Sequence, residues 1–137
     1  MNQEDFISAI KTAVHDSAIE GVKAHLTQLT GRKPYQKLKE LSAWFNALPE
    51  SDKRQVTEVI RLSVHASIFS MLCVLDGGTA IESTSDKGEI RLAFIKRGKD
   101  THLNDPDAEM LHDIYQSLVQ GEVFGKEAQQ GHPPDRR

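Results

Sequence analysis

Residues 51–78 read SDKRQVTEVIRLSVHASIFSMLCVLDGG, and this stretch decides the fold. Apolar side chains recur at every third or fourth position from Val56 to Leu75, which is the spacing of one face of an α-helix. Ser51 suits the N-cap, and Gly77 favours the left-handed turn that ends a helix. Charged side chains lie only in the first half of this helix, whereas the second half is apolar almost all round. We therefore expect the helix to pass from the surface into the core or into a subunit interface.

Two helices are predicted before this stretch. The first carries one apolar stripe and ends before Gly31, which suits a C-terminal cap. The second begins near Pro34 and ends before Pro49, because proline is tolerated in a first turn and disfavours helix in the residue before it. The predicted inward residues are Ile7, Ile10, Val14, Ala18, Val22, Leu26 and Leu29 in the first helix, and Leu38, Leu41, Phe45 and Leu48 in the second.

After the two glycines the apolar spacing changes to two, which is typical of β-strands. Residues 79–83, 89–96 and 101–103 are the candidate strands. A last helix follows, with Asn104 or Asp105 as its cap, Pro106 in its first turn and Gly121 at its end. The predicted class is α+β: three N-terminal helices, a small antiparallel β-meander of two or three strands, then a C-terminal helix.

Length and composition set the broad class of the protein. The chain has 137 residues, which fits a single domain over 1–125 followed by a flexible polar tail over 126–137. A net charge of −3 argues against binding to nucleic acid or to an anionic membrane surface. The acidic start, the lone Cys73 and the lack of an apolar stretch of about 20 residues predict a cytoplasmic location.

Histidines are the residues in this chain that most readily suggest chemistry. Two of the six precede aspartate, in His15-Asp16 and His112-Asp113, a pairing that metal-dependent phosphohydrolases of the HD type use to bind metal. Those enzymes are all-helical, so the predicted strands argue against membership. The alternative that remains is a small metal-dependent hydrolase or ligand-binding protein that uses His65, His112 and Asp113. Our main interpretation includes no cofactor, no metal and no catalytic residue.

Charged side chains are distributed unevenly along the chain. Basic residues gather early, at Lys37 and Lys39 among others, and acidic residues gather late, at Asp105, Asp107 and Glu109. Such asymmetry can steer a charged partner into place. These five residues are therefore our candidate partner-binding residues.

The segment from 65 to 118 resembles small bacterial proteins, with LDGG at 75–78, a hairpin, and LNDP at 103–106. This resemblance implies a bacterial source and no mechanism. The leading hypothesis is a small non-enzymatic bacterial cytoplasmic domain that binds another protein and regulates or neutralises it, as immunity proteins do. A homodimer formed through the helix at 51–75 is a further interpretation, which a Leu72→Asp variant would test, although the same change can disrupt the core by burying a charge.

Overall fold

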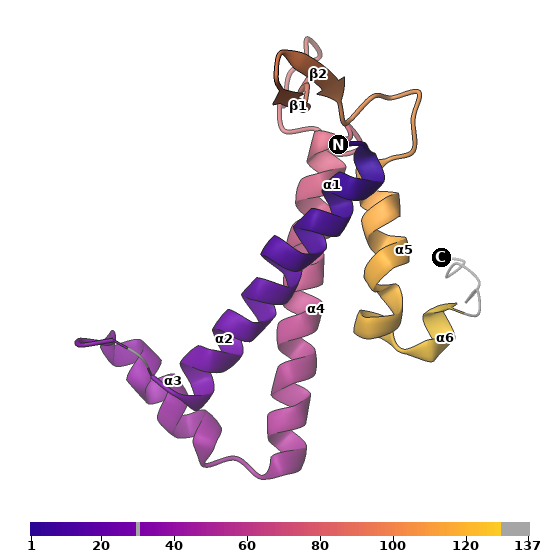
Figure 1. Cartoon of the computed structure of the whole chain (residues 1–137). Helices are drawn as coiled ribbons and strands as arrows, with labels where there is room; N and C mark the ends of the chain where they lie inside the picture. Colours follow the sequence, from indigo (N-terminus) through magenta and orange to yellow (C-terminus); the bar gives the residue numbers. More distant parts are fainter. Residues whose placement is uncertain (30, 130–137) are drawn as a thin grey trace.

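The computed structural model of the protein describes residues 1–29 and 31–129 (Figure 1). It confirms the α+β class, with helices at the N-terminus, a two-stranded antiparallel sheet and a helix near the C-terminus. Residues 130–137 of the predicted tail lie outside the described part. The elements are α1 (Gln3–Ile10), the π-helical η1 (Lys11–Asp16), α2 (Ser17–Thr27), α3 (Gln36–Asn46), α4 (Glu50–Leu75), β1 (Ala93–Lys96), β2 (Lys99–His102), α5 (Leu111–Phe124) and α6 (Lys126–Gln129).

The first three elements form one joined helix, and the π-helical turn in its middle changes which residues face inward. Val14 and Val22, which belong to the predicted stripe, are exposed, whereas His15 and Ile19 are buried. A π-turn holds one more residue than an α-turn, so the inward positions after it advance by one. The predicted stripe was therefore wrong at Val14 and Val22, where the structure buries His15 and Ile19 instead, whereas Leu26 is buried as predicted.

The second helix packs along the first and closes its end. Ser42 Oγ and Asn46 Nδ2 of α3 donate to the Leu26 carbonyl at 2.8 and 3.1 Å. That carbonyl is among the last four of α2, which have no partner within their own helix, so α3 acts as its C-terminal cap. Phe45 of α3 is buried, but Leu41, which was predicted to face inward, is exposed.

The long helix α4 has nearly its predicted bounds. It begins at Glu50, with Pro49 rather than Ser51 in the cap position and without a side-chain capping bond. It ends at Leu75, and Gly77 has φ 77°, the left-handed conformation that glycine adopts most readily. The periodicity of the apolar residues and the glycine stop were therefore sufficient to predict this helix.

The sheet is smaller than predicted. Within residues 1–29 and 31–129 only β1 and β2 form, with Ala93 opposite His102 and a two-residue turn at Arg97 and Gly98 in which both residues have positive φ. Turns of this kind match the natural twist of a hairpin. Residues 79–83 form no strand, because every residue from 79 to 91 is exposed and none gains a dry face to pack. Asn104 fixes the hairpin to α4, since its Nδ2 donates to the Leu75 carbonyl at 2.6 Å.

The last helix begins at Leu111 and not near Pro106, so the predicted cap was wrong. Its first amides are capped from a distant element: Asp76, which follows α4, accepts from the backbone N–H groups of Leu111 at 3.1 Å and His112 at 2.9 Å. Asp105 is used within its own loop, where Oδ1 accepts from the Asp107 amide at 2.9 Å. The capping function is therefore present but is supplied by tertiary contact.

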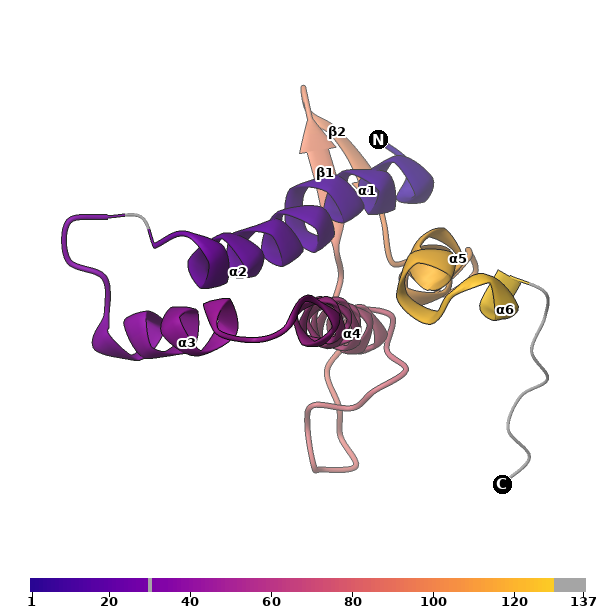
Figure 2. The same cartoon turned by 90° about the horizontal axis from the view of Figure 1, so that it is seen from below.

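The core lies at one end of the molecule, where α1, the second half of α4 and α5 meet. Figure 2 shows α4 end-on, with the first helix and α5 on one side of it and, in the described chain, no helix on the opposite side. Leu72 is 4% exposed and belongs to this core, so it does not lie in an interface. The buried cluster consists of Ile7, Leu72, Leu111, Tyr115 and Val119.

Candidate functional site

The residues predicted to bind a partner lie in two separate places. Lys37 and Lys39 are exposed on α3, whereas Asp107 and Glu109 are exposed in the loop before α5 and Asp105 is half-buried there. Figure 1 shows α3 and this loop at opposite ends of the molecule. The two charge clusters therefore do not form one surface, and each has to be considered separately.

One face of α3 combines basic charge with exposed large side chains. Lys37, Leu41 and Trp44 follow one another at spacings of four and three residues, so they share a face of the helix. Trp44 is 52% exposed, and Tyr35, which directly precedes the helix, is 80% exposed. Tyr35, Lys37, Leu41 and Trp44 are called the α3 face below. Lys39 is also exposed but points in a different direction around the helix.

The surroundings of the α3 face are basic. Residues 31–46 contain Arg32 and Lys33 in addition to Lys37 and Lys39, and their single acidic residue is Glu40. The inward side of α3 is occupied by Ser42 and Phe45, so the exposed residues are not needed for its packing. The sequence contained one indication of this surface: Trp44 lies beside the predicted apolar stripe of the helix and not on it, so it was not expected to face inward.

The histidines of the alternative site do not converge. His65 is buried, its Nε2 lies 2.6 Å from Gln116 Oε1, and its ring stacks on Tyr115. His112 Nδ1 lies 2.6 Å from Asp76 Oδ2. The Phe69 ring contacts both histidine rings, with centroid distances of 5.6 and 5.5 Å, so an apolar side chain separates them.

Asp113 completes the alternative set, and it lies at the edge of the same helix turn. Its Oδ1 is 3.4 Å from His112 Nε2, and most of its carboxylate is exposed. His112 thus has a partner on each ring nitrogen, and the buried partner, Asp76, also caps α5. This arrangement positions the start of α5 and brings no third ligand from the alternative set to His112.

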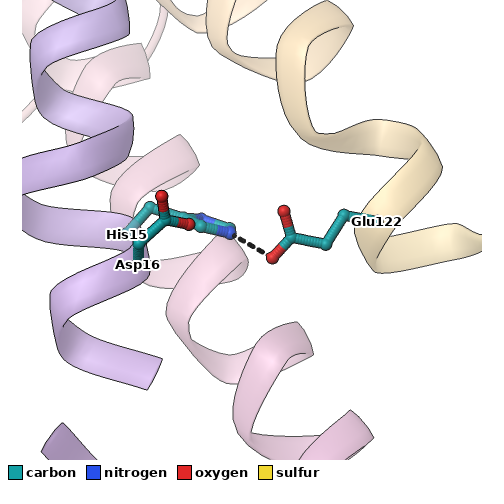
Figure 3. A group of neighbouring side chains, drawn as sticks. All are labelled: His15, Asp16 and Glu122. Atoms are coloured by element: carbon teal, nitrogen blue, oxygen red, sulfur yellow. Dashed lines mark hydrogen bonds and ion pairs between the residues drawn. The ribbon is translucent and has the colours of Figure 1, made fainter. Parts of the chain in front are cut away.

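A different group of ionisable side chains, not predicted as a site from the sequence, meets at the edge of the core, where His15 is buried, Asp16 is half-buried and Glu122 is exposed. Figure 3 shows His15 and Asp16 facing Glu122 from α5, and potential ligand atoms of the three lie within 4.8 Å of one another. Cations already lie beside both carboxylates: Lys11 Nζ is 2.9 Å from Asp16 Oδ2, and an Arg61 nitrogen is 3.4 Å from Glu122 Oε1. The group is therefore satisfied as an ion-pair network that joins η1, α4 and α5.

The histidine of this network is held in one tautomer. Its Nε2 lies 3.0 Å from Glu122 Oε1, and because a carboxylate only accepts, Nε2 must donate. In the neutral ring Nδ1 then accepts from the Tyr115 hydroxyl at 2.7 Å. Burial, together with the negative charges of Glu122 and Asp16, raises the pKa of Tyr115, so its hydroxyl keeps the proton that it donates.

A cavity of about 570 Å³ lies beside the C-terminal end of α4, under the segment from 79 to 90. Its wall is formed largely by apolar side chains such as Leu75, Ile81 and Ile90. The two polar groups at its inner side, Asp76 and Asn104, already bond to backbone within the protein. Four more polar side chains line the cavity from the exposed segment, and one of them, Glu82, accepts from the Gly88 amide within that segment. The other three are Thr79, Lys87 and Glu89.

Comparison with known proteins identifies no relative: no protein-family model, no curated protein and no solved structure matches this chain.

Proposed function

We propose that this chain is a protein-binding domain that regulates or neutralises another protein, and that the α3 face contacts the partner. The observation that supports the proposal is the exposure of Tyr35 and Trp44 on a helix whose opposite side is already packed. Tryptophan, tyrosine and arginine are the residues that most often dominate the energy of protein interfaces. Contact with a partner accounts for large side chains on α3 that its own packing does not use, which supports the proposal.

The charge around these aromatic side chains indicates the chemistry of the partner. Arg32 and Lys33 precede Tyr35 in the chain, and Lys37 shares a helix face with Trp44, so a complementary surface has an apolar pocket for Trp44 and an acidic rim. Rim charges act mainly on the rate of association and are screened by salt. Binding should therefore weaken, but not vanish, as the salt concentration rises.

The test begins with capture of partners by the tagged full chain from an extract of its source organism, followed by mass spectrometry. The captured protein is then purified and titrated against the chain by calorimetry. We expect a stoichiometric complex whose Kd rises about 30-fold or more in Trp44→Ala, because an interface anchor contributes about 2 kcal/mol or more. Lys37→Glu should slow association and reduce the salt dependence.

Phe124→Ala is the matched control, since Phe124 is an aromatic residue of α5 with 47% exposure, close to the 52% of Trp44. It should leave the Kd unchanged. Equal Kd values for the wild-type chain, Trp44→Ala and Lys37→Glu would contradict a role for the α3 face. Failure of the purified chain to bind any captured protein in the titration would contradict the protein-binding function.

A further inference from the structure

The second half of α4 has an exposed side that carries no charge. Arg61 faces the other way, toward Glu122, and no other Asp, Glu, Lys or Arg occurs between Val59 and Leu75. Helix α4 is long and apolar enough to span a membrane by length and composition, and 11% of its most apolar window is buried. The outer face of α4 is defined by six exposed residues, Val59, Leu62, Ser63, Ala66, Ser67 and Ser70.

We propose that a second copy of this chain binds here, and that two α4 helices pair antiparallel through their outer faces about a two-fold axis. This inference concerns a different surface from the α3 face and does not depend on it. A two-fold interface is isologous, so each residue i of one copy that contacts j of the other is matched by j contacting i. The outer face must therefore be complementary to itself.

The order of side chains along the outer face meets this requirement. With the axis between positions 64 and 65, antiparallel pairing places Val59 opposite Ser70 and Leu62 opposite Ser67 of the other copy. Each large side chain thus meets a small one. Helices approach most closely where such large and small residues alternate, because side chains of one fill the spaces on the other.

Two of the three serine hydroxyls of this face can lose water at little cost. Ser63 Oγ donates to the Val59 carbonyl at 2.8 Å, and Ser67 Oγ donates to the Ser63 carbonyl at 2.9 Å. A buried hydroxyl is costly only when its hydrogen bonds are unmade. Because these donors are satisfied within the helix, burial of the face against a second copy leaves neither of them without an acceptor.

The exposed area of the chain is large enough to supply such an interface. Its accessible surface is 10070 Å². A compact monomer of 15.3 kDa exposes about 7,100 Å², so the excess is about 2,900 Å². Obligate homodimers bury about 1,000–2,500 Å² per copy, so the interface must extend from the six residues of the outer face onto exposed neighbours such as Met71, which is 57% exposed.

A lipid environment explains the outer face less well than a second copy does. The inward side of the same helical segment contacts α5, and it contributes His65 and Arg61 to polar contacts there. A helix that spans a bilayer would bring these polar groups and its packed neighbours into hydrocarbon. A helix at a subunit interface can have an uncharged side toward the second copy and polar contacts on the side toward its own chain, as α4 has.

The test is the mass of the purified full chain in solution, measured by sedimentation and by light scattering over about 1–100 μM. We expect twice the 15.3 kDa of one chain. Leu62→Glu should shift the mass to that of one chain, because pairing would bury the new charge. Leu118→Glu on α5 is the matched control, since Leu118 is 45% exposed and Leu62 is 48% exposed, and it should remain dimeric.

Far-UV circular dichroism must show the same helix content in both variants. A wild-type chain that is monomeric throughout, a Leu62→Glu variant that remains dimeric, or a Leu118→Glu variant that dissociates would each overturn the proposal. Monomeric chain that sediments with phosphatidylcholine vesicles would overturn it in favour of a lipid contact.

Oxidative cross-linking tests the antiparallel register. The double variant Val59→Cys/Ser70→Cys should form a covalent dimer, because position 59 of each copy lies beside position 70 of the other and disulfides need Cα atoms within about 7 Å. The wild-type chain, which carries only Cys73, is the control and should not cross-link. Efficient dimer formation by Val59→Cys alone would indicate parallel helices and overturn the stated pairing.

Discussion

The two ends of the protein differ in what their tyrosines contact. Tyr115 is fully buried among the core residues of α1, α4 and α5, and its hydroxyl bonds His15. Tyr35, at the start of α3, is 80% exposed. The first end holds the residues that stabilise the fold, whereas the second displays large side chains that the fold does not use. This separation allows the α3 face to be changed without loss of structure.

The largest expected effect is on the free energy of unfolding when each tyrosine is truncated. Tyr115→Ala should lower it by about 3–5 kcal/mol, because a buried ring leaves a cavity. Tyr35→Ala should change it by less than about 0.5 kcal/mol, as exposed substitutions usually do. Urea unfolding of the two variants at one protein concentration measures both values. Similar losses in the two variants would abolish the distinction between the two ends.

A smaller effect is expected from the residue that joins α4 to α5. Asp76→Ala should lower the free energy of unfolding by about 2–3 kcal/mol, because it removes the cap of α5 and leaves buried donors without an acceptor. Asp105→Ala, at the position where the sequence predicts the cap, should cost less than about 1 kcal/mol. The same urea experiment compares the two, and a greater loss in Asp105→Ala would contradict the capping role of Asp76.

The smallest expected effect concerns alkaline pH. The chain has two tyrosines, so Tyr35→Phe leaves Tyr115 alone, and its ionisation can be followed by tyrosinate absorbance. Because burial raises the pKa of Tyr115 in the folded state, the absorbance should rise at higher pH in the folded variant than in urea, where the pKa of tyrosine is about 10.

The sign of the linked stability change follows from that direction. The unfolded chain releases the tyrosine proton first, so the contribution of Tyr115 is complete below pH about 10 and is lost as the pH rises further. Tyr115→Phe should show less of this alkaline loss than the wild-type chain. Identical titration of the tyrosine in folded and urea-unfolded Tyr35→Phe would contradict its burial.

Several features of the fold could be predicted because they depend on neighbours along the chain. The periodic apolar residues from Val56 to Leu75 and the stop at Gly77 were enough to place α4. The run Arg97-Gly98-Lys99-Asp100, which favours a turn, likewise placed the hairpin, although the turn itself is limited to Arg97 and Gly98 and the other two residues belong to β2. The α+β class follows from these local signals, since helix periodicity and turn chemistry act within a few residues.

The candidate surfaces were predictable only in part. Lys37 was identified from charge, but Trp44 was not, because its exposure depends on which side of α3 packs against α2. The excess of apolar residues in α4 was recognised, but the spacing left open whether Met71 or Leu72 faces inward, and the structure buries Leu72. Spacing shows that a helix has two sides and does not show which one the rest of the chain covers.

Local sequence thus determined the helices, the hairpin and their order. Tertiary contacts determined which polar residues are buried and which residues they bond to. A π-turn turned His15 inward to meet Tyr115 and Glu122, which lie about a hundred positions away in the chain. Asp76 caps a helix that begins 35 residues later. Pairings over such separations depend on how whole helices pack, because a short stretch of sequence specifies the geometry of its own turn and not the partner that it will meet.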